Sequence, residues 1–147
     1  MKKLLCLTLV LITLVCCLSS CALLDKLLGA LEGQLECTPK IEEMMLALAE
    51  GRKDAAMALI HPSSSEEADA GITQLIEYID GSKVATMKAE GININTNLNK
   101  KEGRTEEVVY KITLENGTVM TLEAVYISNS QGDGFVGFKL SKETSNE

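Results

Sequence analysis

The chain opens with a short apolar run that follows two lysines. From Leu4 to Leu18, only Thr8 and Thr13 interrupt the apolar residues. This run of 15 residues is shorter than the roughly 20 that a helix needs to cross a membrane. A positive start, a short apolar middle and a small-residue end are the three parts of a secretory signal. Residues 1–20 are therefore predicted to be a signal peptide.

A leucine stripe follows the predicted signal. Residues 22–36 carry leucines at three- and four-residue spacing, which indicates an amphipathic helix. These leucines are Leu23, Leu24, Leu27, Leu28, Leu31 and Leu35. Gly29 and Gly33 weaken helix formation, so we expect a short helix that lies either on a bilayer surface or on the folded domain. We assign residues 21–37 to a tether.

Helical periodicity continues into the next part of the chain. Thr38 and Pro39 form a good helix start, with an N-cap hydroxyl and a proline at the first helical position. The apolar face of this helix consists of Ile41, Met44, Met45, Leu48 and Ala49. Gly51 lies in the polar stretch that ends or bends the helix. A second short helical segment is predicted over residues 55–60.

A third helix is predicted after Pro62, because the residue before a proline disfavours helical backbone. Ser64 and Glu67 have the spacing of a capping box. One face of the helix then carries Ile72, Leu75, Ile76 and Ile79. Gly81 is expected to end it. His61, the one histidine of the chain, is interpreted as a C-terminal helix cap.

After Gly81 the apolar period changes from 3.6 to 2, which indicates strands. Four strands are predicted, over residues 92–99, 106–114, 118–127 and 135–140. Asn116-Gly117 is a strong signal for a two-residue hairpin turn, and residues 131–134 form a second turn. Helices followed by an antiparallel meander indicate an α+β fold in which the helices pack on one face of a curved four-stranded sheet. The domain is assigned to residues 38–141, with a solvated tail at 142–147.

Charge narrows the classes of partner. Without residues 1–20 the chain has 12 basic and 21 acidic residues and a net charge of −9. Nucleic-acid binding requires clustered Lys and Arg, so no nucleic acid is expected. The same charge disfavours attraction to anionic lipid, so an anchor would have to supply any membrane affinity. The remaining 127 residues are enough for one domain with a core.

The cysteines fall into two groups by position. Cys6, Cys16 and Cys17 would leave with the signal, and Cys21 and Cys37 would remain. No Cys-x-x-Cys pair or ligand cluster predicts a metal site, and no motif predicts a cofactor. Cys37 is interpreted as a small apolar residue at the start of the domain.

Residues Leu18-Ser19-Ser20-Cys21 resemble the lipobox of bacterial lipoproteins. The resemblance implies recognition of Leu18, Ser19 and Ser20 by signal peptidase II and cleavage before Cys21, whose sulfur receives a diacylglyceryl group. Each buried methylene contributes about 0.8 kcal/mol, so two or three acyl chains anchor stably. The implied location is the extracytoplasmic face of the cell membrane, or the outer membrane of a two-membrane cell, because Ala22 is not an Asp-type retention signal.

The segment IEEMMLALAEGRKDAAMALIHP (residues 41–62), with the long strands from Val108 to Leu140, resembles the cone-shaped family of nuclear transport factor 2, ketosteroid isomerase and cystatin-like lipoproteins. In that family the sheet and helices enclose a pocket. A two-residue turn at Asn116-Gly117 would place Tyr110 opposite Glu123 and Ile112 opposite Thr121. Tyr110, Thr121 and Glu123 are therefore the predicted pocket residues.

Three functions remain open from the sequence. The leading interpretation is a lipid-anchored, non-enzymatic module that binds a small apolar ligand or a protein partner. A second is a small pocket enzyme of ketosteroid-isomerase type that uses Tyr110 and Glu123 as acid and base. No catalytic residue of that family can be matched to this chain position by position. A third is a homodimer formed through the open sheet face, on which the two-residue turn would place Val109, Met120 and Leu122.

Overall fold

The computed structural model describes residues 27, 29–30, 33–96 and 103–142, and the chain divides into two compact units, Met1–Gln34 and Leu35–Glu147. In the first unit residues 27, 29 and 30 are helical, and the N–H of Gly33 donates to the carbonyl of Gly29 at 3.3 Å. The predicted lipobox, the end of the first predicted strand and residues 143–147 lie outside the described part. Within that part, no helix has both the length and the apolar character needed to cross a membrane.

The second unit begins with its helices. They are α2 (Cys37–Ala49), α3 (Lys53–Met57), the 3₁₀ helix η1 (Pro62–Ser64) and α4 (Ser65–Ile79). The unit starts at Leu35, whereas the sequence analysis placed the start of the domain at residue 38. Leu35 and Cys37 are both buried, so the last part of the assigned tether belongs to the folded domain. Helix α4 ends where Asp80 and Gly81 take left-handed backbone conformations.

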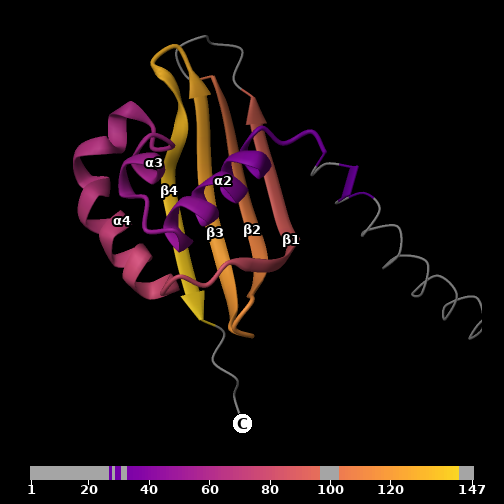
Figure 1. Ribbon diagram of the computed structural model, residues 1–147. Helices are drawn as coiled ribbons and strands as arrows, with labels where there is room; N and C mark the ends of the chain where they lie inside the picture. Colours follow the sequence, from indigo (N-terminus) through magenta and orange to yellow (C-terminus); the bar gives the residue numbers. More distant parts are fainter. Residues whose placement is uncertain (1–26, 28, 31–32, 97–102, 143–147) are drawn as a thin grey trace, which may run out of the picture. The chain divides into compact units, whose positions relative to one another are not determined.

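Four long strands follow the helices. They are β1 (Val84–Thr96), β2 (Arg104–Leu114), β3 (Val119–Asn129) and β4 (Gly132–Lys142). They form one antiparallel sheet in the order β1-β2-β3-β4. Figure 1 shows α2 lying across one face of the curved sheet, with α3 and α4 beside β4. The predicted α+β fold, with helices followed by a four-stranded antiparallel sheet, is confirmed.

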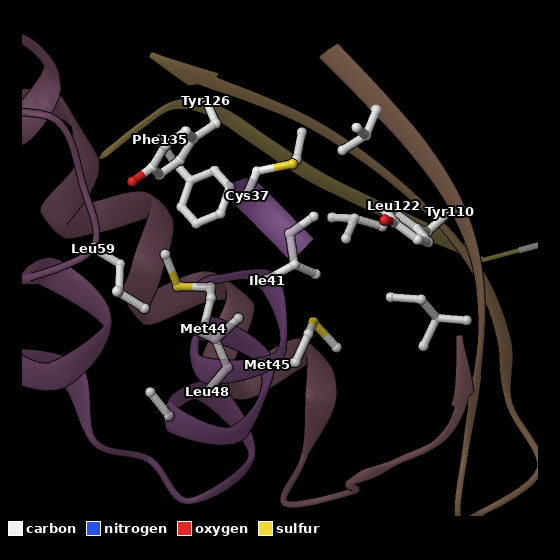
Figure 2. Close-up of a cluster of buried hydrophobic side chains, with 14 of the residues drawn as sticks. Cys37, Ile41, Met44, Met45, Leu48, Leu59, Tyr110, Leu122, Tyr126 and Phe135 are labelled. Carbon is white, nitrogen blue, oxygen red and sulfur yellow. The ribbon is translucent and has the colours of Figure 1, made fainter. Parts of the chain in front are cut away.

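The core lies between α2 and the inner face of the sheet (Figure 2). Strand β2 alternates between buried and less buried positions along its length, as a sheet covered on one side requires. The largest fully buried apolar side chains are Ile41, Met44, Met45, Leu48, Ile79, Tyr110, Ile112, Met120, Leu122 and Phe135. The apolar face predicted for the first helix therefore packs as expected.

The first helix starts differently from the prediction. It begins at Cys37, and Thr38 is not its N-cap. The Thr38 hydroxyl instead lies 2.9 Å from the Tyr110 hydroxyl. The capping acceptor comes from the sheet, because the carboxylate of Glu106 accepts hydrogen bonds from the N–H groups of Glu36 and Cys37 at 3.1 and 2.9 Å.

The third helix also starts without the predicted capping box. Ser64 occupies the N-cap position of α4, but its side chain makes no capping hydrogen bond. The 3₁₀ turn of η1 leads directly into α4, and the Ser64 N–H donates to the carbonyl of His61 at 2.9 Å. His61 caps η1 at its amino end rather than closing a preceding helix, so the predicted C-terminal cap is wrong.

The β2–β3 hairpin has a three-residue loop instead of the predicted two-residue turn. The N–H of Gly117 donates to the carbonyl of Leu114, and the N–H of Leu114 donates to the carbonyl of Thr118, both at 2.9 Å. Gly117 has φ = 84°, the left-handed conformation that closes such loops. The register shifts by one residue, so Tyr110 pairs with Leu122 and Ile112 with Met120.

Strand β4 is bonded to the segment that connects α3 with η1. Ile60 forms a parallel bridge with Phe135. The N–H of Phe135 donates to the carbonyl of Leu59 at 2.9 Å, and the N–H of His61 donates to the carbonyl of Phe135 at 3.0 Å. Gly134 permits this close approach, because a Cβ there would lie 2.7 Å from the Cα of His61.

This contact predicts opposite effects of two Gly→Ala changes. Gly134→Ala is expected to lower the free energy of unfolding by roughly 2–3 kcal/mol, because its Cβ would meet backbone atoms that cannot move aside. Gly71→Ala, where a Cβ would meet open space in α4, is expected to raise it by about 0.5–1 kcal/mol. Urea unfolding followed by circular dichroism measures both. Equal effects would contradict the close-approach explanation.

Candidate functional site

The residues predicted to share a pocket are on opposite faces of the sheet. Tyr110 is fully buried on the inner face, where it pairs with Leu122. Thr121 pairs with Lys111, and Glu123 pairs with Val109, both on the outer face. The Glu123 side chain is 53% exposed and lies 3.5 Å from the Nζ atom of Lys139. The predicted acid–base pair of Tyr110 and Glu123 is therefore wrong. The three-residue loop shifts the register of β3 against β2 by one position, which moves Glu123 to the outer face.

The same shift changes the open sheet face. Met120 and Leu122 were expected outside and are instead completely buried in the core. Figure 2 shows Leu122 and Tyr110 side by side, with Ile41 and Met45 of α2 nearby. These side chains occupy the concave face of the sheet, where the family resemblance implies a pocket.

A buried carboxylate that the sequence analysis did not single out lies near the start of α2. Glu106 is 1% exposed and sits on the inner face of β2. Beyond its bonds to the N–H groups of Glu36 and Cys37, its Oε1 atom lies 2.7 Å from a guanidinium nitrogen of Arg104. Bonds to a charged acceptor are stronger than neutral ones, and a negative charge at a helix amino terminus is stabilised by the helix dipole. The cluster therefore fixes α2 on the sheet.

Cys37 belongs to this cluster, and its thiol is expected to be unreactive. It is fully buried and not in a disulfide. Burial raises the pKa of the Cys37 thiol well above its usual value, and the hydrogen bond to Glu106 raises it further. Burial likewise raises the pKa of the neighbouring Tyr126 hydroxyl. Because the thiolate is the reactive form, Cys37 serves as a small core residue that also donates to Glu106.

His61 lies in a second polar cluster. It is 1% exposed, and its Nδ1 atom lies 2.7 Å from the Ser63 hydroxyl and accepts from the Ser63 N–H at 3.2 Å. Its Nε2 atom lies 3.2 Å from the Oδ1 atom of Asn129, which also accepts from the N–H of Gln131. The ring thus joins η1 to the β3–β4 turn. In the described part of the chain, no group of three or more His, Cys, Asp or Glu side chains could hold a metal ion.

A groove of about 460 Å³ crosses the outer face of the sheet. Its lining comes from all four strands, with valines along the middle and charged or amide side chains at the sides. The outer-face residues are Gly91, Asn93, Glu107, Val109, Glu123, Val125, Gly137 and Lys139. β-Bulges lie next to it in β1, between Ala89 and Gly91, and in the β3–β4 pairing after Val125. Bulges bend strands locally, so the groove lies where two bends meet.

A smaller crevice of about 200 Å³ lies between α4 and β4. Phe135 and Phe138, which meet edge to face with centroids 5.3 Å apart, line it together with Leu75 of α4. Glu67 and Ser64 supply polar groups to its lining. The linings of this crevice and of the outer groove both combine apolar and polar groups. The groove is the larger.

The Glu106 cluster predicts an unequal effect of two neighbouring substitutions. Glu106→Gln is expected to lower the free energy of unfolding by roughly 3 kcal/mol, because it removes the charge that compensates the partly buried Arg104 and caps α2. Glu107→Gln, one residue later on the exposed face, is expected to change it by less than about 0.5 kcal/mol. Chemical unfolding of both variants measures the difference. A Glu106→Gln variant as stable as Glu107→Gln would show that the buried charge contributes nothing.

Cys37 is expected to be unreactive in the native protein. Each unit by which a pKa is raised cuts the thiolate fraction tenfold at a given pH, and burial blocks access as well. At pH 8, a disulfide reagent is expected to modify Cys37 roughly 100-fold or more slowly than in the guanidinium-unfolded chain. Mass spectrometry of the labelled residue gives both rates. Native labelling at the unfolded rate would contradict the buried, protonated thiol.

Comparisons with known proteins give a structural likeness but no sequence match. No protein-family model matches the chain, and a search of curated proteins finds no match. A solved structure of a DUF4783 family protein from Bacteroides ovatus aligns with 69% of this chain and 94% of its own length, at 9% sequence identity and a TM-score of 0.43.

Proposed function

We propose that this chain is a lipid-anchored protein of the extracytoplasmic membrane face that works by binding a partner. The observation that carries the proposal is Leu18-Ser19-Ser20-Cys21 at the end of a short apolar run behind two lysines. In this proposal the chain is cleaved before Cys21, and the lipid on its sulfur holds the protein on the membrane. A cell with two membranes would carry it to the outer one, because Ala22 follows the cysteine.

The length of chain after Cys21 supports display of a folded domain. Thirteen residues separate Cys21 from Leu35, where the compact unit begins. At roughly 3.3–3.6 Å per residue, a chain of this length spans at most about 45 Å, and less where it is helical, as residues 27, 29 and 30 are.

Binding is favoured over catalysis because the structure separates the two residues that the enzyme hypothesis requires. That hypothesis needed Tyr110 and Glu123 together, and they occupy opposite faces of the sheet. The homodimer hypothesis in its original form needed Met120 and Leu122 on the open face, and both are buried in the core. The outer groove remains as a feature with the size of a binding site.

The anchor is tested by changing the cysteine that would carry it. Cys21→Ala is expected to abolish incorporation of a labelled fatty acid and to leave either the unprocessed 15.9 kDa chain or protein released from its lipid anchor. Cys17→Ala, in the discarded segment, serves as the matched control and is expected to behave as the parent chain. Intact mass, metabolic labelling and detergent partitioning give the result. Unchanged labelling in Cys21→Ala would overturn the proposal.

A further inference from the structure

We propose that the edge of β1 over residues 91–96 pairs with the same edge of a second copy of this chain. The two strands run antiparallel and join two four-stranded sheets into one. The inference rests on the proposed binding role and names the surface and the partner. It uses a sheet edge and neither sheet face, so it differs from the homodimer through Met120 and Leu122.

Strand β1 forms one edge of the sheet (Figure 1). Among the residues that the structure describes, β2 is the one strand that pairs with it, so the far side of its backbone has no strand beside it. The other edge is partly covered, because β4 exchanges hydrogen bonds at Phe135 with Leu59 and His61. An open strand edge is a template on which another chain can pair. The sheet can therefore be extended at β1.

The two halves of β1 differ in how they oppose such pairing. The first half contains both β-bulges of the strand and the charged Lys88 and Glu90. Bulges and charged side chains are the usual devices that block pairing at a sheet edge. Residues 91–96 instead pair with β2 at six consecutive positions, without a bulge, a proline or a charged side chain. This segment is therefore the part of the edge that can accept another strand.

The sequence of this segment is complementary to itself. Ile92-Asn93-Ile94 reads the same in both directions, so antiparallel pairing about Asn93 places isoleucine opposite isoleucine and asparagine opposite asparagine. Moving the two-fold axis to Ile94 also pairs like with like. Ile92 and Ile94 lie on the inner face, where they pack against the core but stay partly exposed. A second copy would cover them with an identical apolar pair, while the exposed Asn93 and Asn95 would meet across the outer face.

The charges of the two copies do not oppose this arrangement. The chain has a net charge of −7, so two copies repel each other over most of their surface, but the paired segment is uncharged. In an antiparallel pair, Lys88 and Glu90 of the two copies lie toward opposite ends, so like charges do not face each other. The adjacent carboxylates of β2 already have partners. Glu107 accepts a hydrogen bond from Asn93 at 3.1 Å, and Glu106 accepts from the start of α2.

The test measures dimer formation by the full-length chain, purified in detergent, by sedimentation in density-matched buffer. Since six residues form a small interface, a weak dimer is expected, with a dissociation constant of roughly 1–100 µM. Hydrogen exchange followed by mass spectrometry locates the contact. We expect the amides of residues 91–96 to exchange more slowly as the protein concentration rises, whereas the amides of β4 keep their rates.

Two variants with the same added charge separate the β1 edge from the rest of the surface. The double variant Asn93→Lys, Asn95→Lys places lysines opposite lysines and is expected to raise the dissociation constant at least roughly tenfold. The control, Gln74→Lys with Gln131→Lys, adds equal charge at exposed positions on α4 and in the β3–β4 turn. It is expected to dimerise no more weakly than the parent chain. Circular dichroism checks that both are folded.

Several outcomes would overturn the proposal. They are a monomer up to the highest concentration, a dimer that the β1 variant leaves intact, and a dimer that both variants weaken equally. Slowed exchange confined to another strand or to α4 would also overturn it, because the contact would then lie elsewhere. If the β1 variant does not fold, the exchange of residues 91–96 in the parent chain decides the question. None of these results bears on lipid attachment, which the Cys21→Ala test decides separately.

Discussion

The domain depends on one buried carboxylate. Glu106 lies on the inner face of β2, yet its hydrogen bonds go to the first N–H groups of a helix that lies about 70 residues earlier in the chain. Removing a carboxylate from water costs several kcal/mol unless charge and hydrogen bonds compensate it. Here the start of α2 and the Arg104 guanidinium both do so. The ends of the helix and the strand are therefore held at one point, and the apolar stripe of α2 must meet the inner face of the sheet at that position. Cys37 and Tyr126 complete the cluster at the boundary of the core, where burial keeps their side chains in the neutral form.

A one-residue change in hairpin loop length decides which side of the sheet each β3 residue occupies. Because side chains alternate along a strand, the register shift moves every β3 side chain to the other face. The observed register puts Met120, Leu122, Ala124 and Tyr126 inside. It also leaves Thr121 and Glu123 on the outer face, where Thr121 pairs with Lys111 and Glu123 pairs with Val109. Catalysis by Tyr110 with Glu123 would require the other register, which would bury a carboxylate and expose four apolar side chains. The hydrophobic effect alone favours the observed arrangement, since a buried Leu or Met contributes roughly 1.5–3 kcal/mol.

The sequence predicted the type and order of the elements because their signals are local, although β1 begins at Val84 and not at the predicted residue 92. The 3.6-residue stripe of α2 and the alternation of β2 each follow from residues close together in the chain, and both are confirmed. The long-range features were missed for two reasons. The Asn116-Gly117 pair was interpreted as a two-residue turn, although the apolar alternation of Met120, Leu122, Ala124 and Tyr126 in β3 favours the register that the structure has. Glu106 shares the parity of Val108 and Tyr110, so the alternation already placed a carboxylate on the inner face. What the sequence could not supply was its partners, because no local pattern connects residue 106 with residues 36 and 37.

The two faces of the sheet differ in how their side chains are buried and paired. On the inner face every position from Glu106 to Leu114 of that parity is buried, and the polar groups among them are paired. The outer face keeps glycine at positions 91 and 137, where the absence of positive φ means that the backbone would accept a residue with higher strand propensity. A solvated sheet face that served stability alone would be expected to carry β-branched or charged side chains there, as Val109 and Lys139 do in the next positions. Both glycines stand next to the β-bulges of the sheet, where glycine is common because the strand bends locally. The outer groove is rimmed by exposed side chains of both signs, whereas the buried Glu106 is paired with Arg104 and with the first N–H groups of α2.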